Sequence, residues 1–179
     1  MSTTRPIGPL ALGASLVAAS LAGCANTYSM VGYDVTARSH GVAAQAVGKD
    51  DGQTGTFAAG FGAGPIALEA VVRGHDLETT NDAWLSASGG LELKVRVLGL
   101  GPAQTFVHGG AVRAVLFDRD SMSAVWGVGY AYGATLAVGK AGIRGYVDAH
   151  VEELTYTGEG VMSGAGTIST TTAGLMIGR

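Results

Sequence analysis

The sequence has one cysteine, four prolines and little charge. A single cysteine excludes an intrachain disulfide framework, a cysteine-based metal site and a redox pair. Charged residues make up 14% of the chain, against about 25% in typical soluble domains. The net charge of −3 gives no sign of nucleic-acid binding. The four histidines lack any metal-ligand spacing, so we expect neither a metal nor a cofactor.

The first 23 residues have the layout of a secretory signal. Arg5 supplies the positive charge near the start, and residues 10–23 form a short apolar stretch that ends in small residues. This stretch is short and rich in Ala, Gly and Ser, whereas a transmembrane helix needs about 20 mainly apolar residues. We therefore predict that residues 1–23 are a signal peptide that is removed on export. The alternative is a signal-anchor helix with an incidental cysteine.

The segment Leu21-Ala22-Gly23-Cys24 resembles the lipobox of bacterial lipoproteins. The resemblance implies that the lipoprotein processing machinery attaches a diacylglyceryl group to Cys24, with fatty acids such as palmitate, and cuts just before it. An unpaired thiol in an exported protein calls for such an explanation. Ala25 stands where enterobacterial lipoproteins kept in the inner membrane have Asp. We therefore expect a protein anchored by lipid in the outer membrane of the cell envelope.

After the signal, the chain is long enough for one domain. Residues 24–40 show no clear period and are predicted to be a lipidated tether. From Gly41 to Arg179 the dominant period is two, which predicts strands. We expect eight, at roughly 41–48, 54–61, 65–75, 84–97, 104–117, 123–138, 142–156 and 164–178. Tight Gly-rich turns alternate with polar, mostly acidic loops, as in outer-membrane barrels with short periplasmic turns.

Each of the longer predicted strands has one apolar and one polar or tiny face. In strand 84–97, for example, Leu91, Leu93 and Val95 alternate with charged residues. Only Glu153 places a charge on an apolar face. Nine charged residues, five basic and four acidic, lie on the polar faces: Glu69, Arg73, Glu92, Lys94, Arg96, Arg113, Arg144, Asp148 and Glu152.

Alternation alone does not tell which face points inward. A soluble barrel has an apolar interior that can bind an apolar ligand, whereas a membrane barrel turns its apolar face to lipid. The nine charges would nearly neutralise one another, as burial requires. An eight-stranded barrel is just wide enough to be filled by side chains. We therefore favour a membrane barrel whose lumen is plugged by these charges, with a lipid-tethered soluble carrier as the alternative.

Residues 54–179 resemble the small eight-stranded outer-membrane barrels such as OmpX and the OmpA transmembrane domain. The likeness lies in segments such as Trp126–Gly133 followed by Ile143–Glu153. It implies an all-β, up-and-down antiparallel barrel inserted by the barrel assembly machinery, with a structural or surface-interaction role. The end Ile177-Gly178-Arg179 departs from the aromatic last residue usual in those barrels. A lipid-modifying enzyme with His150 as general base is disfavoured, because no Ser lies at a recognisable spacing from it.

Overall fold

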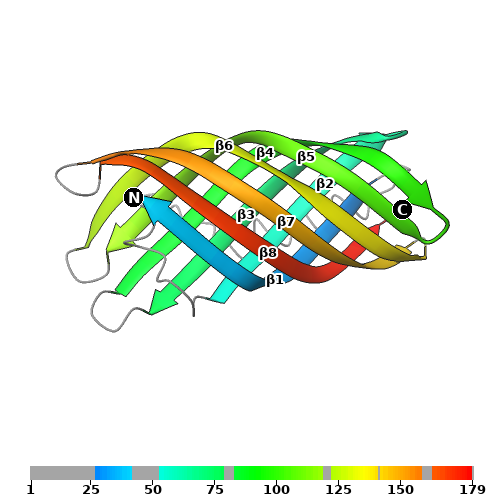
Figure 1. The fold of residues 1–179 in the computed structure, drawn as a ribbon, viewed down its shortest axis with the longest axis horizontal. Helices are drawn as coiled ribbons and strands as arrows, with labels where there is room; N and C mark the ends of the chain where they lie inside the picture. The colour runs from blue at the N-terminus through cyan, green and yellow to red at the C-terminus, as the bar shows by residue number, and fades with distance from the viewer. Residues whose placement is uncertain are drawn as a thin grey trace, which may run out of the picture.

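The computed structural model describes residues 27–41, 53–78, 83–118, 122–140, 142–158 and 163–178. They form eight strands: β1 Thr27–Gly41, β2 Gln53–Ala63, β3 Ile66–Glu78, β4 Ala83–Leu100, β5 Ala103–Asp118, β6 Ser123–Lys140, β7 Gly142–Thr157 and β8 Gly164–Gly178. Every strand pairs antiparallel with its sequence neighbours, and β1 also pairs with β8 (Figure 1). The prediction of an eight-stranded up-and-down barrel is confirmed. Within the described ranges, no helix is long and apolar enough to cross a membrane.

The first strand lies earlier in the chain than predicted. β1 spans Thr27–Gly41, so the segment predicted as a tether is a wall strand, and only Gly41 of the predicted strand 41–48 lies within it. The rest of that predicted strand lies outside the described residues. A shift of register against β8 between Asp34 and Thr36 interrupts the alternation of β1. This irregularity explains why a search for period two missed the strand.

The two ends of the barrel differ as the turn chemistry predicts. Gly64-Pro65 and Gly101-Pro102 connect β2 to β3 and β4 to β5 as two-residue turns. Gly64 and Gly101 have φ of 63° and 58°, which glycine adopts at no steric cost. The β6–β7 connection and both ends of the wall, Thr27 and Gly178, lie at this same tight-turn end. The longer polar connections lie at the opposite end, which we call the loop end.

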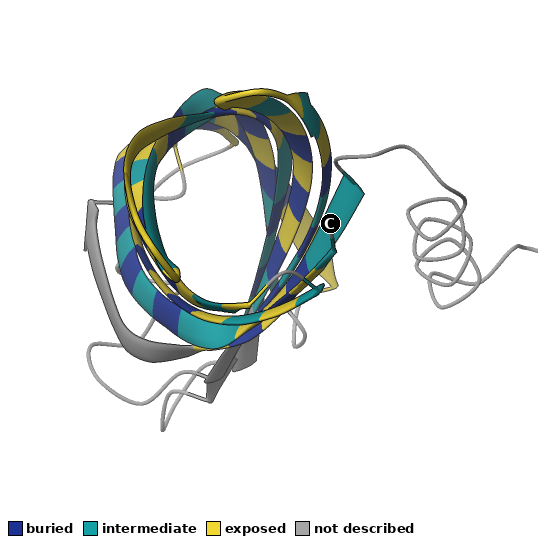
Figure 2. Cartoon of the chain, turned by 90° about the vertical axis from the view of Figure 1, so that its right-hand side faces the viewer, coloured by how far each residue is buried: buried dark blue, intermediate teal, exposed yellow. Residues whose placement is uncertain are grey.

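The apolar strand faces point outward. Leu91 and Leu93 are 59% and 50% exposed. The residues that alternate with them, Glu92 and Lys94, are 1% and 2% exposed. Figure 2 shows this alternation of buried and exposed residues along the coloured parts of the wall. A soluble barrel with an apolar binding cavity requires the opposite arrangement. The carrier alternative is therefore wrong.

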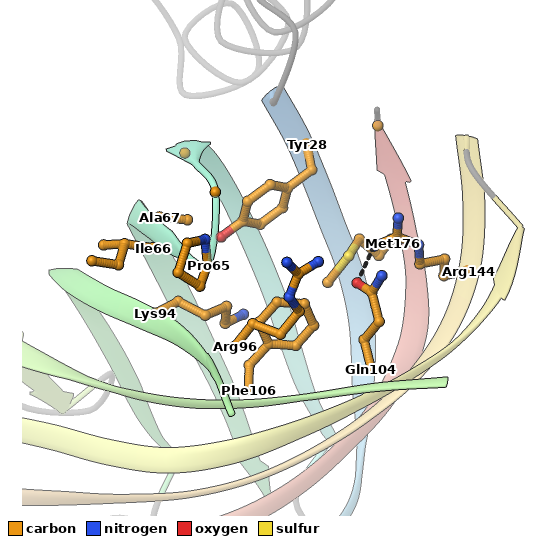
Figure 3. A pocket seen from close by; sticks show the side chains of 13 residues that line it. Tyr28, Pro65, Ile66, Ala67, Lys94, Arg96, Gln104, Phe106, Arg144 and Met176 are labelled. Atoms are coloured by element: carbon orange, nitrogen blue, oxygen red, sulfur yellow. Dashed lines mark hydrogen bonds between the residues drawn. The ribbon is translucent and has the colours of Figure 1, made fainter. Parts of the chain in front are cut away.

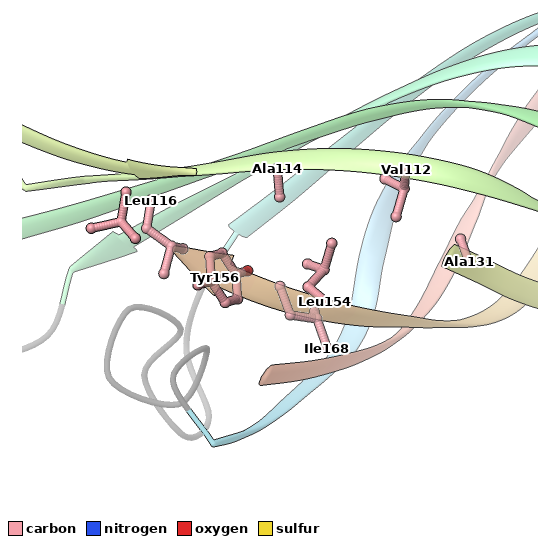
Figure 4. Packing of buried hydrophobic residues seen from close by; sticks show 8 residues of the cluster. Val112, Ala114, Leu116, Ala131, Leu154, Tyr156 and Ile168 are labelled. Atoms are coloured by element: carbon pink, nitrogen blue, oxygen red, sulfur yellow. The ribbon is translucent and has the colours of Figure 1, made fainter. Parts of the chain in front are cut away.

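Side chains fill the lumen in layers. Toward the loop end, Leu116, Leu154, Tyr156 and Ile168 belong to an apolar cluster that spans β5 to β8 (Figure 4). A second apolar cluster lies toward the tight-turn end and contains Met30, Ala58, Val71, Ala137, Tyr146 and Met176. Buried charged residues from β3, β4, β5 and β7 fill the rest of the lumen.

Candidate functional site

The buried charges are organised around Arg73 of β3. Its Nη2 lies 2.8 Å from Glu92 Oε1 of β4, and its Nη1 lies 3.0 Å from Glu152 Oε1 of β7. Ser88 Oγ donates a further hydrogen bond of 2.8 Å to the same Glu152 oxygen. Arg73 therefore ties β3 to its neighbour β4 and, across the lumen, to β7. The planar guanidinium suits this role because it can donate to two carboxylates at once.

His108 of β5 extends this network. Its Nδ1 lies 2.5 Å from Glu92 Oε2, and its Nε2 lies 2.9 Å from Asp148 Oδ1. A neutral imidazole can donate from only one ring nitrogen, so two carboxylate contacts call for the imidazolium form or a protonated carboxylic acid. Asp148 also accepts from Thr135 Oγ1 at 2.5 Å. The network thus links β3, β4, β5, β6 and β7.

A separate buried pair lies nearer the tight-turn end. Lys94 Nζ is 2.8 Å from Glu69 Oε2 and 3.3 Å from the sulfur of Met30. The same ammonium lies 5.7 Å from the ring centroid of Tyr28 and 6.0 Å from that of Phe106. Both distances are in the range of cation–π attraction. Lys94 is therefore neutralised by one acid and held against aromatic rings.

Six of the nine predicted lumen charges are buried in the lumen: Glu69, Arg73, Glu92, Lys94, Asp148 and Glu152. Arg96 is exposed and Arg144 is half-buried, because both lie at the tight-turn mouth. Arg113 was assigned to the wrong face: it is exposed, between buried Val112 and Ala114. Arg113 has the strand parity of the outward Val107, whereas His108 has the inward parity.

Sequence reasoning missed His108 as a member of the network, and also Ser88, Thr135 and Thr170. His108 could have been predicted to point inward because it lies an even number of residues from Gln104 in strand 104–117, and so on the same face. Thr135 shares its face with glycines and alanines, so nothing in the pattern distinguishes it from a small wall residue. Partners across the lumen come from different hairpins, and their meeting depends on the stagger of the whole barrel.

Glu153 lies on the apolar exterior, as predicted. Its carboxylate accepts hydrogen bonds from Tyr130 Oη at 2.7 Å and from Tyr132 Oη at 2.9 Å. The two rings stack with centroids 6.3 Å apart. This pair of phenols satisfies a charge that would otherwise stand uncompensated on the outer wall.

The histidines of the lumen are buried. Asp148, His150 and Thr170 follow one another as in a proton relay, with His150 Nδ1 at 3.2 Å from Asp148 Oδ2 and Nε2 at 2.7 Å from Thr170 Oγ1. These residues are 7%, 2% and 4% exposed, so the hydroxyl is buried, although His150 and Thr170 also line a cavity together with Tyr132 and Ser169. Among the residues that the structure describes, no group of His, Cys, Asp and Glu could hold a metal ion.

Fold and site together define a closed eight-stranded β-barrel with an apolar exterior and a charged, side-chain-filled interior. The crystal structure of Neisserial surface protein A (NspA) has this fold, with a TM-score of 0.61 at 14% identity over 86% of this chain and 97% of that one. The attachment invasion locus protein Ail of Yersinia pestis matches with a TM-score of 0.49 at 12% identity, over 86% of this chain and all of Ail. No protein-family model and no curated protein sequence matches the chain.

Proposed function

We propose that this protein is a lipoprotein of the outer membrane whose barrel spans the bilayer and has a structural or surface-interaction role. The charged lumen acts as a plug, and the acidic loops face the environment. We propose no enzymatic activity, since the one relay-like arrangement is buried. Among the proteins of this fold, NspA is named a surface protein, which is in keeping with such a role.

This proposal rests on the distribution of side chains in the wall, which is the reverse of that in a soluble barrel. Apolar side chains from Val31 on β1 to Ile177 on β8 face outward, while carboxylates and cations lie inside. Such an exterior is stable in hydrocarbon and unfavourable in water. The β1–β8 pairing also closes the barrel, so no strand edge with unpaired backbone groups is exposed to lipid. Strands of 11 to 18 residues meet or exceed the roughly 9–11 residues needed to cross the bilayer when tilted.

The start of β1 supports an attachment of the proposed lipid near the barrel rim. Only Ala25 and Asn26 separate Cys24 from Thr27, the first residue of the wall. Three residue spacings reach at most about 11 Å. With the tight-turn end in the periplasm, a diacylglyceryl group on Cys24 would enter the inner leaflet of the outer membrane beside β1. The lipid would then be a second attachment next to a barrel that is already embedded.

The membrane barrel is tested by removing the lipid. We replace residues 1–24 by a secretory signal that is cleaved without lipid attachment, and we compare this variant with the wild type. Both are expected in the detergent-extracted membrane fraction, and both should migrate faster on SDS gels before boiling than after it. Labelling with a palmitate analogue should mark the wild type only. Release of the unlipidated variant into the aqueous fraction would overturn the membrane barrel, and an unlabelled wild type would overturn the lipidation.

The plug predicts an impermeable barrel. Purified protein in liposomes is expected to give no conductance steps and no uptake of small sugars, because ion-paired side chains occupy the lumen. As a matched control, Glu92→Ala with Arg73→Ala removes one ion pair and the centre of the network, and should raise ion leakage. Wild-type conductance equal to that of this double variant would contradict the plug and indicate a pore.

A further inference from the structure

The tight-turn mouth of the barrel is a basic cup. A cavity of about 140 Å³ opens there, lined by Tyr28, Phe106 and Met176, which form its apolar floor, and by basic residues that lie among them. Figure 3 shows Lys94, Arg96 and Arg144 around this cavity, with Lys94 and Arg96 near the ring of Phe106 and Arg144 beside Gln104. The cup therefore combines an apolar floor with three cationic groups.

Two of these cations have no negative partner among the residues that the structure describes. Glu69 neutralises Lys94, and the other three buried acids contact Arg73 or a histidine deeper in the lumen. Within the described residues, no carboxylate pairs with Arg96 or Arg144. The network can therefore be satisfied without them, and the mouth keeps an excess of positive charge. Sequence reasoning assigned both arginines to the plug, but their position separates them from it.

A side-chain hydrogen bond positions the guanidinium of Arg144, and a bulge and a backbone hydrogen bond fix the main chain at Arg96. Gln104 Oε1 accepts a hydrogen bond of 2.9 Å from Arg144 Nη1, which leaves the rest of the guanidinium fork available. At Arg96 the β4–β5 register shifts, so this strand has a bulge at the mouth. The backbone N–H of Arg96 donates to the Pro65 carbonyl at 2.7 Å, which ties the bulge to the β2–β3 turn. Bulges of this kind re-aim side chains next to functional sites.

Charge is also segregated along the barrel axis. Lys94, Arg96, Lys140 and Arg144 lie in the part of the wall near the tight turns, where Glu69 is the nearest acid. In the sequence, the segments between β1 and β2, β3 and β4, β5 and β6, and β7 and β8 are mostly acidic, with Asp50, Asp51, Asp82, Asp120 and Glu159 against Lys49 and Arg119. An anion is therefore attracted to the basic tight-turn end.

We propose that the cup binds a phosphate group. Two arginine side chains at one mouth fit the bidentate geometry that guanidinium makes with phosphate oxygens, and the apolar floor accepts a short aliphatic or glycerol-like extension. The phosphate can come from the headgroup of an anionic phospholipid at the bilayer surface or from a free phosphate ion. This inference goes beyond the proposed surface role, and it stands on the cup whether or not Cys24 is lipidated.

The test measures binding to the full-length folded protein in a neutral maltoside detergent at low salt. The probes are dihexanoylphosphatidylglycerol, inorganic phosphate and, as a control without phosphate, dihexanoylglycerol. Wild-type protein is expected to bind the phospholipid at least tenfold more tightly than the diacylglycerol. Arg96→Gln with Arg144→Gln should weaken this binding at least tenfold. Lys140→Gln removes an exposed charge at the same end outside the cup, and it should change binding less than twofold.

The outcomes separate the sources and can overturn the proposal. Inorganic phosphate that binds as tightly as the phospholipid assigns the cup to the free ion, and binding of the phospholipid alone assigns it to the headgroup. Arg96→Lys with Arg144→Lys keeps the charge but loses the fork, so an intermediate affinity is expected. The proposal is wrong if neither phosphate probe binds, if the Gln variant binds within twofold of wild type, or if Lys140→Gln loses as much. The boiling-dependent gel shift checks that each variant is folded.

Discussion

Arg73→Met is expected to lower the free energy of unfolding by about 3–5 kcal/mol, since it removes the central cation of a buried network, leaving Glu152 without a cationic partner and Glu92 with His108 alone. Glu92 and Glu152 are 1% and 0% exposed, so water cannot take over the contacts that Arg73 makes with them. Methionine has a similar length, which limits the effect of a cavity. The measurement is equilibrium urea unfolding from lipid vesicles, followed by tryptophan fluorescence.

The matched control for this variant is Arg113→Met. It makes the same chemical change on β5, at an arginine that is exposed on the outer wall. We expect an effect well below that of Arg73→Met and of either sign. A triple variant that adds Glu92→Gln and Glu152→Gln to Arg73→Met should recover at least half of the loss, because neutral amides can remain buried at lower cost. A loss below about 1 kcal/mol for Arg73→Met would show that the contacts are solvated, as for surface pairs.

Much of the fold follows from local pattern. Alternation in β3, β4, β6 and β7 is largely regular, and glycine-rich turns mark three of the hairpins, so seven of the eight strands and their antiparallel order could be predicted. β1 could not, because its bulge breaks the period and its first residues follow Cys24 without a turn signal. A bulge is defined by its pairing with the neighbouring strand. For β1 that strand is β8, at the other end of the chain, so the local sequence does not reveal the bulge.

The site was predictable in part, for a related reason. Charges that alternate with a clearly apolar face, such as Glu92 and Lys94 in β4, were placed correctly. In β5 near the loop end both faces are apolar, so the charge of Arg113 does not mark the inward face. Inward parity on that strand is set by Gln104 and His108 instead. The separation of Arg96 and Arg144 from the plug depends on depth along the barrel, which alternation does not report.

Arginine substitutions on the outer wall are expected to have the second large effect on the free energy of unfolding, and this effect should depend on depth in the bilayer. Leu91 is at the middle of β4 (Ala83–Leu100) and is 59% exposed on the outer wall. If that wall faces lipid, Leu91→Arg is expected to cost about 2–4 kcal/mol, as a guanidinium at the bilayer midplane must be hydrated or displaced toward the interface. Leu100→Arg on the same strand, at the tight-turn rim and 68% exposed, should cost only about 0–1 kcal/mol.

The comparison of these two variants separates a lipid-facing wall from one that faces water. Both positions are exposed leucines on one strand, so in water the same change would have a similar and small effect at each. We measure both by urea unfolding from vesicles, with Leu93→Arg as a second site close to the middle. A gradient of cost from the strand centre to the rim supports the membrane-spanning barrel. Equal costs at Leu91 and Leu100 would mean that the apolar exterior is covered by something other than a bilayer, because only a bilayer makes the cost depend on depth along the barrel axis.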